Sequence, residues 1–296
     1  FWVKFLKDRG FLSVEEPFKK LINQGMILGE SAFVHRLEGE NKLITSNQIE
    51  GLNTQPIHAD ISFVNNVNEL NIEAFKNWRP EFKDAEFITE EDGTFKVSRE
   101  VEKMSKSKYN VVNPDDICEQ YGADTLRMYE MFLGPLEQAK PWSTAGITGV
   151  YSFLKKTWRL FHSGLEDSFF VSDQAASKDS LKILHKTIKK VIEDIENFSF
   201  NTSVSTFMIA VNELGTQKCN SKEVLAPLLI LLSPYAPHIS EELWSKLGNK
   251  ESISTAPFPK FEEKYLIALI PSLIIGTLTT MFLCNFANSC FFFNSK

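Results

Sequence analysis

One loop holds the residues of this sequence that are best suited to phosphate chemistry. It consists of Lys103, Met104, Ser105, Lys106 and Ser107. Two lysines separated by small hydroxyl residues can place ammonium groups and O–H or N–H donors along a polyphosphate. The pattern indicates an ATP loop, and an ordinary solvated basic loop is the alternative.

The residues after the loop favour the ATP interpretation because they predict a firmly capped helix. Asn113 suits the N-cap and Pro114 the first helical position. Asp115 and Asp116 suit the first turn, where acids face the free backbone N–H groups. Helices are expected over residues 115–121 and 123–133, hinged at Gly122. A basic loop therefore lies directly before a helix start.

Three other residues are weaker candidates. Arg127 has a spacing on the second helix that suits a ribose-phosphate contact, and a surface ion pair with Asp124 or Glu130 is an equally good alternative. His58 has no partner at a spacing that would build a reactive site, so we interpret it as a half-buried strand histidine. His238, at the start of an expected helix, should cap or pack there.

The hydrophobic pattern predicts an α/β part followed by an all-α part. Residues 1–23 carry apolar positions that predict two short helices of a core, and residues 24–36 predict a strand. Short alternating runs between polar loops predict a small β-rich insert over residues 37–100, with a hairpin turn at residues 92–93. From residue 145 onward, amphipathic helices with short linkers predict an up-and-down bundle.

The composition indicates a folded protein in a reducing compartment. The length of 296 residues allows two domains, and the net charge of −6 argues against nonspecific polyanion binding by the whole surface. The cysteines are Cys118, Cys219, Cys284 and Cys290, which are too scattered for a disulfide framework or a zinc site. No metal site on the protein and no signal peptide are expected, and a cytoplasmic location follows as the expectation.

Several longer segments resemble a known family. Residues 103–142 read KMSKSKYNVVNPDDICEQYGADTLRMYEMFLGPLEQAKPW and resemble the signature loop and following region of class I aminoacyl-tRNA synthetases, most closely the leucyl enzymes of bacteria. The resemblance extends to residues 18–27 (FKKLINQGMI), 194–202 (DIENFSFNT) and 234–244 (PYAPHISEELW). It covers most of the chain.

The resemblance implies a division of the chain into five parts. These are the C-terminal part of a Rossmann-like α/β catalytic core (1–36), a small β-rich insert (37–100), the KMSKS loop with connecting helices (101–144), an all-α bundle that resembles anticodon-binding domains (145–250) and an atypical apolar tail (251–296). The implied fold class is an α/β remnant followed by a helical bundle. A monomer is expected from the family.

The implied activity is leucine–tRNA ligation, in which ATP activates leucine and the leucyl group passes to tRNA(Leu). Such chemistry depends on positioning and on charge stabilisation at the α-phosphoryl transition state. By resemblance, Lys106 would neutralise the leaving phosphates with support from Lys103. Met104, Ser105 and Ser107 would shape the loop and hold the nucleotide by backbone contacts. Mg²⁺ would share the phosphate charge.

Two groups of basic residues on the expected bundle helices are candidate tRNA contacts. The first group comprises Lys155, Lys156 and Arg159, and the second comprises Lys182, Lys186, Lys189 and Lys190. Taken alone, such groups more often mark a solvated helix face. Within a synthetase-like bundle they would hold the tRNA backbone and supply salt-dependent affinity without reading bases.

One departure from the family pattern concerns the second half of the ATP site. A His-x-Gly-His turn, which would hold ATP from the opposite side, does not occur in the sequence. The leucine pocket and the editing domain are expected before Phe1. We therefore expect no leucine activation by the chain alone, and a separately made N-terminal half is a candidate partner. The alternative functions are a tRNA-binding helical module and a non-functional product of a truncated or frameshifted gene.

The other departure is the segment from Tyr265 to Ser295, which contains no charged residue. Its length and apolar content make it a candidate membrane span. Pro271 and the absence of a flanking basic cluster weaken that interpretation. A shifted reading frame is favoured because charge is lost abruptly, and a buried helix is the third alternative.

Overall fold

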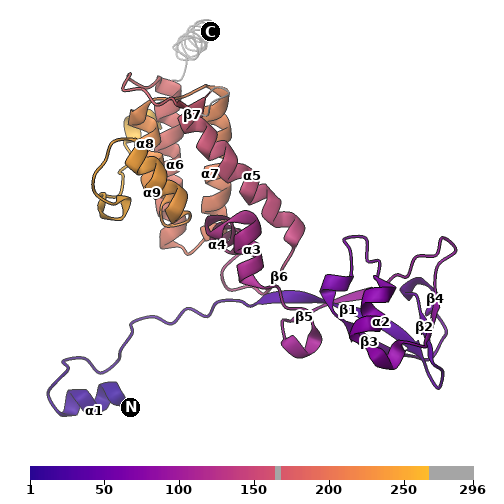
Figure 1. Cartoon of the computed structure of the whole chain (residues 1–296). Helices are drawn as coiled ribbons and strands as arrows, with labels where there is room; N and C mark the ends of the chain where they lie inside the picture. The colour runs from indigo at the N-terminus through magenta and orange to yellow at the C-terminus, as the bar shows by residue number, and fades with distance from the viewer. Residues whose placement is uncertain (164–167, 267–296) are drawn as a thin grey trace, which may run out of the picture.

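A long central strand and a helical bundle organise the molecule. The computed structural model describes residues 1–163 and 168–266. Figure 1 shows one body built around a sheet and another built of helices, with the first residues of the chain extending away from both. The two bodies meet where the lysine loop leaves the sheet.

The sheet part has one long strand and several short ones. Its elements are α1 (Trp2–Asp8), β1 (Ile27–Leu37), β2 (Lys42–Ile44), β3 (Thr54–Ala59), α2 (Ile72–Trp78), β4 (Glu86–Ile88), β5 (Ser98–Lys103) and β6 (Lys140–Pro141), with 3-10 turns η1 (Ser46–Gln48), η2 (Ile61–Phe63), η3 (Pro80–Phe82) and η4 (Lys106–Lys108). β1 pairs antiparallel with β2, β3 and β5 and parallel with β6. β4 extends the sheet by pairing parallel with β2. β1 therefore fixes the position of β5, from which the lysine loop departs.

A small core lies against this sheet. Ala32 and Val34 of β1 and Leu43 of β2 are fully buried in it. Phe75 of α2 and Phe95 pack against them. Burial of large aromatic side chains is the main source of stability in so small a body.

The bundle part contains most of the helical residues. Its elements are α3 (Pro114–Tyr121), α4 (Ala123–Phe132), α5 (Thr144–Phe161), β7 (His162–Ser163), β8 (Ser168–Phe169), α6 (Lys178–Glu196), α7 (Phe200–Thr216), α8 (Lys222–Leu232), α9 (Pro237–Lys246), η5 (Ile253–Thr255) and η6 (Glu263–Tyr265). On α6 the apolar residues Leu184, Ile188 and Val191 are buried, while lysines on the opposite face are exposed. Met128 and Tyr129 of α4 belong to the same core. α4 thus packs as part of the bundle.

The order of an α/β part followed by an all-α bundle confirms the fold class expected from the sequence. Asn113 caps α3 as expected, because its side chain accepts a hydrogen bond from Asp115 N at 3.2 Å. Gly122 separates α3 from α4 with a φ of 87°, a conformation that glycine adopts readily. The local signals of this region were sufficient to place both helices.

The expectation of two packed helices within residues 1–23 is wrong. Only α1 forms there, and the exposed fractions of Phe1, Phe18 and Leu21 are 92%, 81% and 84%. Within residues 1–163 and 168–266, no surface covers these side chains. Isolated helices shorter than about 12–15 residues are marginal in water, so an apolar pattern without a packing surface does not produce a second helix.

The expected hairpin at residues 92–93 is also wrong. A turn is present, since Gly93 has a φ of 80° and donates from its N–H to Glu90 O at 3.0 Å. The strands on either side do not pair with each other, because β4 pairs with β2 and β5 pairs with β1. Long-range sheet pairing therefore overrides the local hairpin signal.

The expected domain limits stay a prediction, and two of them fall within strands of the sheet. β1 continues past residue 36 and β5 past residue 100, so one sheet spans both proposed limits. In the part of the chain that the structure describes, no helix is long and apolar enough to cross a bilayer. The candidate membrane segment lies outside the described residues from position 267 onward.

Candidate nucleotide loop and basic bundle surface

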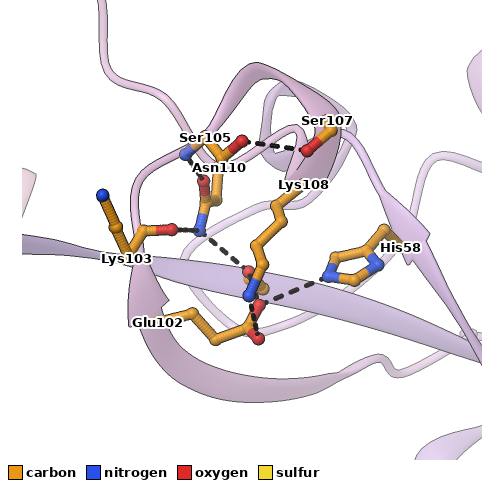
Figure 2. A network of polar contacts seen from close by, with 8 residues as sticks. His58, Glu102, Lys103, Ser105, Ser107, Lys108 and Asn110 are labelled. Carbon is orange, nitrogen blue, oxygen red and sulfur yellow. Dashed lines mark hydrogen bonds and ion pairs between the residues drawn. The ribbon is translucent and has the colours of Figure 1, made fainter.

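The lysine loop begins at the end of β5 and passes through η4 before α3. Lys103 and Lys106 are exposed, and their ammonium groups have no hydrogen-bond or ion-pair partner among the described residues. In Figure 2 the Lys103 side chain points away from the polar network behind the loop. Two positive charges are thus presented to solvent and available to an anion.

The third lysine of the loop region has a different environment. Lys108 Nζ contacts Glu102 Oε1 at 2.5 Å, and Glu102 Oε2 accepts a hydrogen bond from Ser31 Oγ at 2.5 Å (Figure 2). His58 Nε2 lies 3.3 Å from the same oxygen. The Lys108 ammonium and the Ser31 hydroxyl hold the pKa of Glu102 at about 2, well below its ordinary value of 4.5. Lys108 is therefore neutralised by a carboxylate that stays ionised.

A buried asparagine ties the loop to the sheet. Asn110 is fully buried, and its Oδ1 accepts a hydrogen bond from Ser105 N at 2.8 Å. Its Nδ2 donates to Ser31 Oγ at 2.9 Å and to Lys103 O at 3.4 Å. The hydroxyls of Ser105 and Ser107 are 2.9 Å apart. One side chain therefore connects both ends of the segment 103–105 with β1.

The residue before this asparagine fastens the loop to the rest of the sheet body. Tyr109 has left-handed backbone angles, φ 53° and ψ 31°, and its carbonyl accepts a hydrogen bond from Ile61 N at 3.2 Å. Its ring meets Trp78 edge-on with centroids 4.6 Å apart. Gly29 of β1 lies so close that a Cβ there would be 2.6 Å from Asn110 O. The absence of a side chain at Gly29 therefore allows the backbone of Asn110 to pack closely against β1.

The basic groups of the bundle differ in how free their members are. On α5, Lys156 donates to Asn212 Oδ1 at 3.0 Å and Lys155 lies over the Tyr151 ring. On α6, Lys190 forms an ion pair with Asp194, whose side chain is only 4% exposed, and Lys189 lies over a ring. The members with neither a polar partner nor a ring contact among the described residues are Arg159, Lys182 and Lys186.

Lys182 and Lys186 face an open hollow between α6 and α7. The hollow has a volume of about 430 Å³ and is also lined by Glu213, Thr216 and Gln217. Its two carboxylates, Asp179 and Glu213, lie beside a hydroxyl and an amide group, which suit contacts to sugar and phosphate oxygens as well as to water. The structure therefore brings two of the candidate tRNA contacts together.

Arg127 makes a structural contact that the sequence did not predict. Its Nε and Nη2 both donate to Pro234 O, at 3.1 and 3.0 Å, and among the described residues it forms no ion pair with Asp124 or Glu130. The ribose-phosphate contact stays a prediction. The fork geometry of guanidinium allows both bonds to one carbonyl. Arg127 thereby joins α4 to the turn before α9.

A cavity of about 660 Å³ lies beside this contact, between the bundle and the start of β1. Phe200 and Tyr235 form part of its wall, together with Arg127, Glu130 and Lys140. Burial raises the pKa of Glu130 and lowers that of Lys140. The charged form of both side chains is therefore less favourable here than in water.

Comparisons with known proteins identify two segments of the chain. Residues 88–143 match the family of class I tRNA synthetases for isoleucine, leucine, methionine and valine, and residues 177–281 match the anticodon-binding domain of tRNA ligases. The leucine–tRNA ligase of Christiangramia forsetii is 74% identical over 267 residues, which are 90% of this chain and 27% of that protein. The chain belongs to the leucyl-tRNA synthetase family. The Flavobacterium johnsoniae leucine–tRNA ligase is 65% identical over 90% of this chain and 28% of its own length.

A solved structure supports the fold of this synthetase segment. A ternary complex of the Agrobacterium radiobacter agnB2 LeuRS with tRNA and LeuAMS shares the fold with a TM-score of 0.54 and 24% identity, over 90% of this chain and 27% of that chain. The chain spans little more than a quarter of the length of the curated relatives cited here. Their complete activities are therefore proposals for this chain.

Most of the candidate site residues predicted from the sequence lie in two regions of the structure. Lys103 to Ser107 form one loop, and the α5 and α6 groups lie on the bundle. His58 is a half-buried strand histidine as expected, with its side chain 29% exposed. His238 lies at the start of α9 as expected, with Nδ1 2.8 Å from Asp124 Oδ1.

Sequence reasoning missed the residues behind the loop. Ser31 and Glu102 are 71 positions apart, and Ser31 and Asn110 are 79 apart, so no local pattern connects them. The only sequence signal was the position of Asn110 directly after the lysine tract. Buried polar side chains near a reactive loop are found only once the sheet register is known.

Proposed function

We propose that this chain supplies the phosphate-binding loop and the tRNA-binding bundle of a leucine–tRNA ligase. One observation carries the proposal: of the three lysines in the loop region, Lys108 is neutralised by Glu102, whereas Lys103 and Lys106 are exposed. Relatives that are 74% and 65% identical and bear the name leucine–tRNA ligase support the reaction class. The substrates are then ATP, leucine and tRNA(Leu).

The proposed role of the loop is electrostatic. Lys106 neutralises the β,γ-phosphates as they leave, and Lys103 supports it, because fixed cations near developing negative charge lower the barrier without rearrangement. Met104 and Ser107 shape the loop. The N–H of Ser105 donates to Asn110, so we assign Ser105 a role in loop shape rather than a direct nucleotide contact.

Magnesium enters this proposal only with the nucleotide. Among the residues that the structure describes, no group of three or more His, Cys, Asp or Glu side chains could hold a metal ion. The side chains at the loop are cations and hydroxyls, which fit phosphate oxygens and not a metal. Mg²⁺ is therefore assigned no ligand on this chain, and no step is derived through it.

Calorimetric titration with Mg·ATP and with pyrophosphate tests the phosphate-binding role. Lys106→Ala should weaken pyrophosphate binding about tenfold, which corresponds to about 1.4 kcal/mol, and Lys103→Ala should weaken it less. Lys83→Ala, which changes an exposed lysine elsewhere on the sheet body, is the matched control and should have no effect. Equal affinities for the wild type and both loop variants would refute the proposed role.

The bundle is the proposed tRNA-binding module, supported by the match of residues 177–281 to anticodon-binding domains. Lys182 and Lys186 are the contacts we favour because both are exposed and line one hollow. Gel-shift affinity for tRNA(Leu) should fall with salt and fall further for Lys182→Glu with Lys186→Glu, since each lost phosphate contact reduces the salt slope by about 0.7–0.9. Affinity indifferent to both changes would eliminate this surface.

The cellular setting of the proposal follows from its substrates. We place the protein in the cytoplasm as a monomer, where tRNA(Leu) and ATP are present. A polypeptide that carries the other parts of the relatives' length is the proposed protein partner. Co-purification would show that the two chains associate, and the combined chains should carry out leucine-dependent ATP–pyrophosphate exchange. Exchange by the chain alone would contradict the need for such a partner.

A further inference from the structure

The strongest unexplained feature is the complete burial of Asn110 beside an exposed cationic loop. Its side-chain amide uses one acceptor and two donors, through contacts with Ser105 N, Ser31 Oγ and Lys103 O. The orientation of the amide is fixed by these partners. A flipped amide would place NH₂ against the Ser105 N–H and an oxygen against the Lys103 carbonyl, and both contacts would be repulsive.

The contacts of Asn110 determine the shape of the loop backbone. Lys103 O and Ser105 N stand on either side of Met104, so holding both restricts the backbone torsions that set the separation of Lys103 and Lys106. Figure 2 shows the amide lying inside the loop, between these two backbone groups. The residue works as a clamp on the inner side, while the lysine heads remain on the outer side.

The chain accepts backbone strain in order to place this clamp. Tyr109, directly before Asn110, occupies the left-handed region, which is unfavourable for a residue with a Cβ. The hydrogen bond from Ile61 N and the edge-on contact with Trp78 hold Tyr109 there. Strain of this kind persists only where the surroundings determine it, and it recurs at functional sites.

The clamp is also joined to the charge network that occupies Lys108. Ser31 Oγ accepts from Asn110 Nδ2 and donates to Glu102, which in turn binds Lys108 Nζ. Hydrogen-bonded chains in a partly buried region order each of their members. The same network therefore fixes the loop and removes one of the three lysines from the phosphate-binding face.

We propose that Asn110 is a positioning residue that, through Lys103 O and Ser105 N, sets the spacing of the two phosphate-binding lysines. This inference rests on the proposed function for the identity of the ligand. It requires an uncharged amide: aspartate would face the Lys103 carbonyl with a second oxygen, and alanine would leave the Ser105 N–H without its acceptor.

Hydrogen exchange of the Ser105 amide tests the clamp without any ligand. In the folded wild type this amide should exchange at least about tenfold more slowly than in Asn110→Ala, because local opening must precede exchange of a bonded N–H. Asn113→Ala is the matched control, since Asn113 caps α3 through Asp115 N and does not contact the loop. Unchanged Ser105 exchange in Asn110→Ala would overturn the clamp.

Pyrophosphate titration then tests the effect on the lysines. Asn110→Ala should bind pyrophosphate about tenfold more weakly than wild type, while Asn113→Ala binds normally even though its melting temperature falls. Normal binding by Asn110→Ala would overturn the positioning role. If the wild type itself binds no pyrophosphate, the proposed function fails, and the exchange measurement still decides whether the clamp exists.

A gentler variant covers the case in which Asn110→Ala does not fold. Ser31→Ala keeps the buried volume nearly unchanged and removes only the hydroxyl that links Asn110 to β1 and Glu102. Faster exchange at Ser105 and weaker pyrophosphate binding, both smaller than for Asn110→Ala, are expected. Wild-type values in both measurements would again contradict the positioning role.

Discussion

Asp124 should contribute more to stability than any first-turn acid on the surface, because it caps a helix other than its own. It lies in the first turn of α4, and its side chain is 10% exposed. Its Oδ1 accepts from His238 N at 3.1 Å and its Oδ2 from Ile239 N at 2.7 Å. Ala236, the N-cap residue of α9, provides no side-chain cap. Asp124 therefore satisfies the free N–H groups of α9 from across the bundle.

The expected loss for Asp124→Ala follows from these contacts. A lost N-cap costs about 0.5–2 kcal/mol, and hydrogen bonds to a charged group contribute about 1.5–3 kcal/mol each to stability. Burying the carboxylate has its own cost, which offsets part of this gain. We expect Asp124→Ala to lower the free energy of unfolding by about 2–3 kcal/mol. Asp124→Asn keeps one acceptor and should lose about half as much.

Urea unfolding followed by far-UV circular dichroism measures this loss. The control is Asp115→Ala in the first turn of α3, where the carboxylate is exposed and acts only on the helix dipole. Its cost should be about 0.3–1 kcal/mol. The slope of the transition should stay constant, so that the midpoint alone shifts. A loss for Asp124→Ala no larger than that for Asp115→Ala would refute the reasoning.

Two further predictions concern other contacts. His185 is held neutral, since burial lowers its pKa below 6.5 and its Nδ1 accepts from Glu262 N at 3.0 Å. Its contribution to the free energy of unfolding should be complete above about pH 6.5 and fall as the pH drops toward the lower folded pKa. His185→Phe should reduce the pH dependence of the urea unfolding midpoint. Equal pH profiles for the wild type and this variant would contradict the prediction. Gly29→Ala should destabilise by about 1–3 kcal/mol through contact with Asn110 O. At Gly149 an added Cβ would have no atom within 4 Å, so Gly149→Ala should stabilise α5 by about 1 kcal/mol. Thermal melts of both glycine variants measure these changes, and equal shifts in melting temperature would disprove the steric argument.

The sequence by itself determined the features that depend on neighbouring residues. The N-cap Asn113, the hinge at Gly122 and the amphipathic spacing on α6 are local, so the helices they predict are present. The chemistry of the lysine loop was also readable, because ammonium groups at close spacing are suited to phosphate wherever the fold places them. These signals fixed the order of an α/β part and a helical bundle.

Only the tertiary structure decided which charges are free. Lys103, Lys106 and Lys108 are alike in sequence, and Lys108 is distinguished by a carboxylate that β1 holds in place through Ser31. Asp124 meets His238 across 114 positions, which no periodic pattern could reveal. The physical reason is the same in each case: buried polar groups need partners, and partners distant in sequence are supplied by sheet register and helix packing. The positions of Lys103 and Lys106 thus depend on contacts made on the inner side of the loop.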